Sequence, residues 1–122
     1  MEKPEKIKID DVEYVRKDSQ METAKQLDGM DYVVIRTYSA GVHVGYLKKK
    51  EGREVTLRQS IRIHYWDGAN SLSQLAVDGV SKPQNCRFAV PIDTIILMEV
   101  LEIILCTEKA RKNIQGVKSW KI

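Results

Sequence analysis

The sequence predicts a single α+β domain over residues 1–122, built from an antiparallel β-meander and two or three short helices. Apolar residues make up 43% of the chain, which is enough to bury one core. Three β-rich runs follow one another with connections of only two or three residues, which is typical of antiparallel strands. Two segments that begin near residues 72 and 108 start with good helix caps and therefore predict helices.

The meander is predicted from residue types and from the breaks between them. β-branched and aromatic residues favour strands in each of its runs. A small-residue break at 39–41 and a Glu-Gly turn at 51–52 separate these runs. Three strands are therefore expected, over residues 31–38, 42–50 and 53–66.

Alternation along the third strand predicts two different faces. Tyr65 is in phase with Ile61 and Ile63, so these three side chains are expected in the core. The opposite face then carries Arg62, His64 and Trp66. An exposed tryptophan on that face has three explanations: a nucleobase stacks on it, a partner subunit covers it, or a helix packs over it.

The N-terminal part is predicted from shorter patterns. Residues 6–16 alternate apolar and polar side chains around two aspartates, which predicts a hairpin. Residues 18–29 predict a short helix with Met21, Ala24 and Leu27 directed inward, and a polar linker is the alternative.

The two helices of the second half are predicted from their caps. The first begins at Leu72, after Asn70 or Ser71 as the cap. The second covers residues 108–117, with Thr107 as its cap.

Two further segments and the tail complete the layout. Residues 86–90 predict a short strand. For residues 94–105, the five β-branched side chains favour a strand, and a helix stays open as the alternative. Trp120 is expected to anchor the C-terminal tail.

Charge and hydropathy exclude several classes of protein. The formal net charge of +3 is spread evenly, with 12 basic and 11 acidic residues in 1–61 and 8 and 6 in 62–122. A duplex-binding domain concentrates its basic residues, so duplex nucleic acid is not expected as a partner. The N-terminus has no apolar signal region and the apolar run 95–104 is too short to span a bilayer. A cytoplasmic protein without membrane contact is expected, with Cys86 and Cys106 as reduced thiols.

Catalytic and metal chemistry find little support in the sequence. His43 and His64 lack the close-spaced partners of zinc sites, and no nucleophile-elbow signature is present. No enzyme activity, metal or cofactor is therefore expected.

Ligand binding is better supported, at the junction from strand to turn to helix over residues 59–79. The helix start offers free N–H groups to an anion, and arginines on the strands offer bidentate donors to phosphate. The alternative for the arginines is pairing with Asp or Glu on the solvated face. The predicted ligand-binding side chains are Arg36, Tyr38, Ser39, Arg58, Arg62, His64, Trp66, Asp67, Ser71, Gln74, Lys109 and Arg111.

Three stretches carry a resemblance to a known family: YSAGVHVGYL, RIHYWDGANSLSQLAVDGV and ILCTEKARKNI. In this order they resemble the phage and prophage anti-Thoeris proteins of the first type, over about residues 31–120. The resemblance implies a non-enzymatic sponge that sequesters the glycocyclic ADP-ribose made by bacterial TIR-domain defence enzymes. It also implies a homodimer that assembles into a hexamer, and binding of cyclic oligonucleotides in separate pockets by some members.

Two other functions stay open beside this one. The first is a phage accessory protein that binds single-stranded nucleic acid or a host protein through the basic and aromatic face of the sheet. The second is a small structural module without a ligand, in which Trp66 is only an interface residue.

Overall fold

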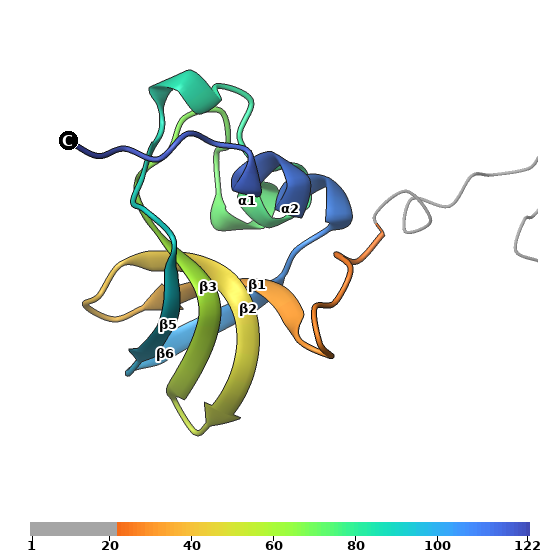
Figure 1. Cartoon of the computed structure of the whole chain (residues 1–122), viewed down its shortest axis with the longest axis vertical. Coiled ribbons are helices and arrows are strands. Elements are labelled where there is room, and N and C mark those ends of the chain that lie inside the picture. The colour runs from red at the N-terminus through yellow and green to blue at the C-terminus, as the bar shows by residue number, and fades with distance from the viewer. Residues whose placement is uncertain (1–21) are drawn as a thin grey trace, which may run out of the picture.

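Six antiparallel strands form one sheet that curves until its two ends approach each other (Figure 1). The computed structural model describes residues 22–122, which form one α+β domain. The meander consists of β1 (Asp31–Thr37), β2 (Val42–Glu51) and β3 (Glu54–Tyr65). The remaining strands are β4 (Arg87–Phe88), β5 (Ile92–Leu97) and β6 (Val100–Leu105).

The curvature follows from where the last two strands pair. β5 pairs with β3, whereas β6 pairs with β1 on the other side of the meander. Only Met98 and Glu99 separate β5 from β6, so the two ends of the sheet must lie close together. The curled sheet encloses a core of Val33, Ile35, Val55, Leu57, Leu97 and Val100.

The two helices cover the other face of the sheet (Figure 1). α1 (Leu72–Asp78) and α2 (Glu108–Gln115) pack side by side over a second core. That core contains the largest buried aromatic side chains and the inward residues of both helices: Tyr32, Val34, Val44, Tyr46, Ile61, Ile63, Leu75, Phe88 and Ile114.

A bulge in β3 lets this strand contribute side chains to both cores. Val55 and Leu57 face the enclosed core, whereas Ile61 and Ile63 face the helices, although all four positions are odd. The register against β2 shifts between these pairs, and Gln59 in between has a φ of 52°. An extra residue in one strand reverses the alternation of faces beyond it.

Most of the predicted elements are confirmed. The three strands of the meander and both helices lie within one or two residues of their expected bounds, with Ser71 and Thr107 as the helix caps. The strand prediction for 94–105 is correct in type, but the structure divides it into β5 and β6. Trp120 does fix the tail, since its N–H donates to the Phe88 carbonyl at 2.8 Å.

The helix predicted over residues 18–29 is wrong in its described part. Residues 22–29 contain two isolated bridges and a turn instead. The Ala24 N–H donates to the Cys106 carbonyl, and the Glu108 N–H donates to the Glu22 carbonyl. Pairing with a distant segment therefore replaces the local helix, although Ala24 is buried as expected. The hairpin predicted at 6–16 and the inward Met21 lie outside the described residues.

Candidate functional site

An open hollow of about 350 Å³ lies between the sheet and the start of α1. Strands β1, β2 and β6 contribute its floor, and the turn after β3 and the first turn of α1 contribute its wall. Its lining residues come from segments that are far apart in the sequence: Arg36, Val42, Trp66, Leu72, Ser73, Glu102 and Ile104.

Trp66 provides the aromatic wall of this hollow. Its indole is half-buried against the helix-side core, and its Nε1–H donates to the Ala69 carbonyl at 3.2 Å. The prediction that Trp66 lies with His64 on the face away from the core is therefore wrong. The predicted core position of Tyr65 is also wrong, since this side chain is 53% exposed. β3 ends at Tyr65 after a register shift that follows Ile63, so the alternation of faces does not continue to Trp66.

Arg36 provides the basic group. It lies opposite Glu102 in the β1–β6 register, and its Nε–H donates to Glu102 Oε2 at 2.8 Å. Both side chains are exposed, and a pair of this kind stabilises a fold by at most about 1 kcal/mol. The pair occupies only one edge of the guanidinium, so the Nη groups can turn toward a ligand in the hollow.

The start of α1 is already capped by its own side chains. Ser71 Oγ accepts from the Gln74 N–H at 3.1 Å, and Gln74 Oε1 accepts from the Asn70 N–H at 2.8 Å. Ser71 and Gln74 thus hold the helix start in place behind Leu72 and Ser73. They position the wall of the hollow and do not line it.

Arg62 and His64 lie on the other face of the sheet, away from Trp66. Arg62 Nη1 donates to the Ala40 carbonyl at 3.1 Å, and the buried His43 ring contacts the same carbonyl at 2.9 Å. The ring of His64 lies 5.5 Å from that of Trp120. Arg62 and His64 therefore do not form one site with Arg36.

Three other predicted ligand groups hold the fold together. Arg58 donates to Asp93 of β5 at 2.9 Å, which lowers the pKa of that carboxyl group. Asp67 accepts from Asn85 at 2.9 Å, and Lys109 donates to Asp78 at 3.3 Å. Tyr38 and Ser39 are exposed at the turn between β1 and β2, outside the hollow.

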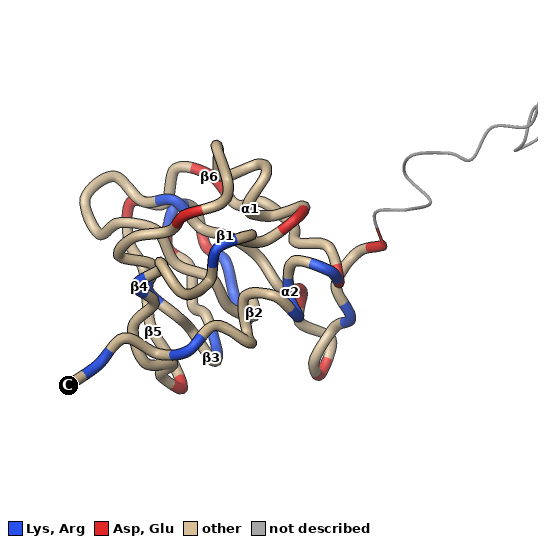
Figure 2. Tube along the Cα trace, turned by 90° about the horizontal axis from the view of Figure 1, so that it is seen from above, with Lys and Arg blue, Asp and Glu red and all other residues tan. Residues whose placement is uncertain are grey.

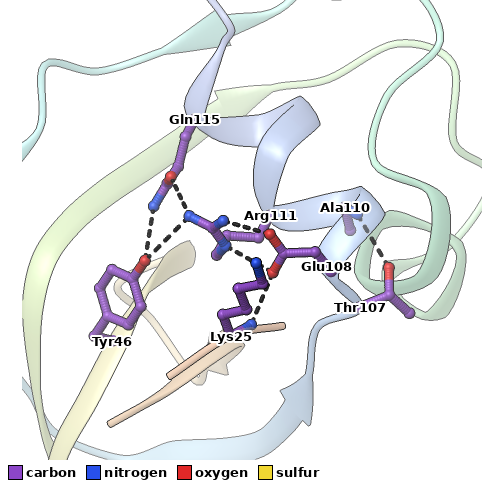
Figure 3. A network of polar contacts seen from close by, with 7 residues as sticks. All are labelled: Lys25, Tyr46, Thr107, Glu108, Ala110, Arg111 and Gln115. Carbon is purple, nitrogen blue, oxygen red and sulfur yellow. Dashed lines mark hydrogen bonds and ion pairs between the residues drawn. The ribbon is translucent and has the colours of Figure 1, made fainter. Parts of the chain in front are cut away.

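Arg111 is the centre of a separate polar network (Figure 3). Its guanidinium pairs with Glu108 and donates to the hydroxyl of Tyr46 and to the side chain of Gln115. Glu108 also accepts from the Lys25 N–H at 2.7 Å. The hydrogen bonds from Arg111 and from Lys25 lower the pKa of Glu108 to about 2. This network ties α2 to β2 and to the segment before β1.

Comparison with known proteins gives one match. A family model described as a domain of unknown function (DUF6948) matches residues 30–114. The chain belongs to this family. All seven residues that line the hollow lie within the DUF6948 region, whereas Trp120 lies beyond it. No curated protein and no solved structure matches the chain.

The sequence interpretation of this DUF6948 protein missed five of the lining residues: Val42, Leu72, Ser73, Glu102 and Ile104. The pattern at 94–105 did place Glu102 in a strand, but only the pairing register brings it to Arg36. Within residues 22–122, no cluster of three or more His, Cys, Asp or Glu side chains is placed to hold a metal ion. None of the helices in that range is long and apolar enough to cross a membrane.

Proposed function

We propose that this DUF6948 protein binds and sequesters a glycocyclic ADP-ribose signal, made by bacterial TIR-domain defence enzymes, without cleaving it. The observation that carries the proposal is that Trp66 and Arg36 line one hollow. Its volume of about 350 Å³ falls in the lower range of small-molecule sites. The hollow also lies on the strand–turn–helix segment that carries the resemblance to the anti-Thoeris proteins.

Each part of the ligand has a matching group. The indole of Trp66 offers a face on which adenine stacks, and Arg36 offers its Nη groups to the pyrophosphate. The hydroxyl of Ser73 can accept from or donate to a ribose hydroxyl. Glu102 repels an anion, so binding includes rotation of Arg36 away from this carboxylate.

A second copy of the chain would close the open side of the hollow. Within residues 22–122, β6 pairs with β1 alone, so its outer edge is free. An antiparallel pairing of two β6 strands centred on Ile103 brings Leu101 of each copy opposite Leu105 of the other. Both leucines are exposed in the single chain. This register also keeps the two Glu102 carboxylates from facing each other.

The proposed working form is therefore a homodimer, which assembles further into a hexamer in the cytoplasm of the infected bacterium. Closure between two subunits excludes water from the ligand and so raises the affinity for it. Sequestration of this kind needs no catalytic group. A sponge must bind at about micromolar affinity or better, roughly −8 kcal/mol, to compete with an effector. Cyclic oligonucleotides are a second proposed class of ligand, in pockets separate from the hollow.

A sequestration assay tests the proposal directly. The protein is mixed with the cyclic ADP-ribose isomer and then heated, and the supernatant is analysed for released compound. Intact compound, together with a ligand-dependent rise in melting temperature, supports sequestration. A cleaved product would make the protein an enzyme, and an unchanged melting temperature with every isomer would refute binding.

Matched variants locate the site. Trp66→Ala is expected to weaken binding about tenfold, since one stacked base contributes roughly 1–3 kcal/mol. Arg36→Ala is expected to weaken binding by a similar factor, since a hydrogen bond to a charged group contributes roughly 1.5–3 kcal/mol. Trp66→Phe keeps an aromatic face and should retain most of the affinity. Arg53→Ala, at the exposed hairpin turn between β2 and β3, is the control for the loss of one positive charge. Equal affinity in all four variants would place the ligand elsewhere.

A further inference from the structure

A second aromatic surface lies where the C-terminal tail meets the sheet. We name it the tail surface and define it by His64, Arg87, Lys118 and Trp120. The tail runs beside β4, since Ser119 bridges Phe88 in parallel orientation and the Trp120 N–H donates to the Phe88 carbonyl. The backbone therefore fixes Trp120, while its side chain stays 53% exposed.

Two side chains from different strands converge on this indole. The ring of His64, from β3, lies 5.5 Å from the Trp120 ring at an interplanar angle of 68°. The guanidinium carbon of Arg87, from β4, lies 5.4 Å from the ring centroid. A tryptophan held by a histidine and an arginine in this way keeps a fixed orientation and still offers aromatic surface to solvent.

A hollow of about 370 Å³ adjoins the same indole. Its lining combines apolar, amide and basic side chains: Pro83, Gln84, Cys86, Lys118 and Trp120. It is separate from the first hollow and shares no lining residue with it. A flat ring that enters it would meet the edge or face of Trp120, with a positive charge at the rim.

The charged side chains of the two segments that form this hollow are basic. Residues 79–92 and 116–122 contain four basic residues and no acidic one. In Figure 2 the C-terminal tail accordingly shows the blue of its lysines and no red of Asp or Glu. Within residues 22–122, neither Arg87 nor Lys118 forms an ion pair. The acid on the adjoining turn is Asp67, whose carboxylate accepts from Asn85.

We infer that the tail surface binds single-stranded nucleic acid. An unpaired base stacks on Trp120 in the adjoining hollow, and Arg87 and Lys118 contact the flanking phosphates. Aromatic faces combined with a basic track are the usual means of binding single strands without sequence preference. A duplex hides its base faces, and the surface lacks the long basic element that duplex binding needs. This inference does not depend on the proposed nucleotide site around Trp66.

Fluorescence anisotropy of the full chain with a labelled 12-nucleotide oligo(dT) or oligo(U) tests the inference. Binding is expected at 50 mM salt and should weaken steeply by 200 mM, whereas a duplex of equal length should bind less tightly. Trp120→Ala should weaken binding about tenfold, and Trp120→Phe should restore most of it. The double variant Arg87→Ala/Lys118→Ala should reduce the salt slope by about 1.4, or roughly 0.7 per phosphate contact.

The control variants are Tyr38→Ala and Lys50→Ala, which remove an exposed aromatic and an exposed basic side chain outside both hollows. Both should bind the oligonucleotide as the parent does. No binding by the parent at 50 mM salt would overturn the inference. Equal affinity and salt slope in Trp120→Phe, the double variant and the parent would overturn it as well, even if Trp120→Ala fails to fold.

Discussion

Arg36 and Glu102 lie directly opposite each other on β1 and β6, and the Nε–H of Arg36 donates to Glu102 Oε2 at 2.8 Å. The pair sits at the edge of the hollow that Trp66 lines. Glu102 therefore both orients the guanidinium and opposes any anion that approaches it. Removal of the negative charge of Glu102 should separate its orienting effect on Arg36 from its repulsion of an anionic ligand.

Glu102→Gln is expected to tighten the binding of pyrophosphate ligands, because it removes the competing carboxylate and leaves Arg36 in place. The expected gain is about three- to tenfold, or up to about 1.4 kcal/mol. Fold stability should change by less than about 1 kcal/mol because the pair is exposed. Isothermal titration with ADP-ribose and its cyclic isomers measures the effect. Glu51→Gln, at the distant hairpin, is the control, and weaker binding by Glu102→Gln would contradict the role given to Arg36.

Gly79→Ala is expected to destabilise the protein by about 2 kcal/mol or more. Gly79 has a φ of 76°, and a Cβ atom there would lie 2.3 Å from Asn113 Oδ1. Asn113 of α2 makes two hydrogen bonds to the backbone of Val80, just beyond the end of α1, so a displaced amide would lose them. Urea denaturation measures the free energy of unfolding. Gly29→Ala has a similar φ of 81° but no neighbouring atom within 4 Å, so it should cost only about 1 kcal/mol.

The Glu108–Arg111 pair should make stability depend on acid pH. Because the pKa of Glu108 falls from 4.5 to about 2 in the folded protein, the stabilisation is complete above about pH 4.5. It is lost as the pH falls from there toward 2. Arg111→Met should raise the pKa of Glu108, lower the melting temperature at neutral pH and flatten this acid dependence. Lys109→Met removes an exposed charge from the same helix and should preserve the dependence.

His43 should give a second pH dependence, near neutrality. Burial lowers its pKa below the ordinary 6.5, and the nearby charges of Arg62 and His64 lower it further. The unfolded chain then binds the proton more readily, so stability should fall as the pH drops below about 6.5, by at most about 1.4 kcal/mol per unit. Denaturation of His43→Gln should lack this slope. His64→Gln, an exposed histidine, should retain it.

Much of the fold could be predicted from the sequence because the deciding interactions are local. The cap at Thr107 bonds the Ala110 N–H three residues away, and Ser71 bonds Gln74 in the same way. The turn at residues 51–52 joins neighbouring strands. Patterns of this kind need only a few consecutive residues. The α+β class, the three strands of the meander and the two helices are therefore predicted correctly.

The candidate site could be predicted only in part, because its residues meet through long-range pairing. Of the twelve predicted ligand residues, only Arg36 and Trp66 line the hollow. Glu102 reaches Arg36 across 66 positions of sequence, through the β1–β6 register. No local pattern encodes that register, since it depends on how the curled sheet closes.

The sequence by itself determined where the strands lie, where the helices begin and that ligand-type groups gather between residues 59 and 79. Tertiary structure decided which face each group occupies. The bulge at Gln59 reverses the faces of β3, and the end of β3 at Tyr65 places Trp66 beside Arg36 rather than beside His64. The physical reason is that one extra residue in a strand costs little locally, yet it moves every following side chain to the other side of the sheet.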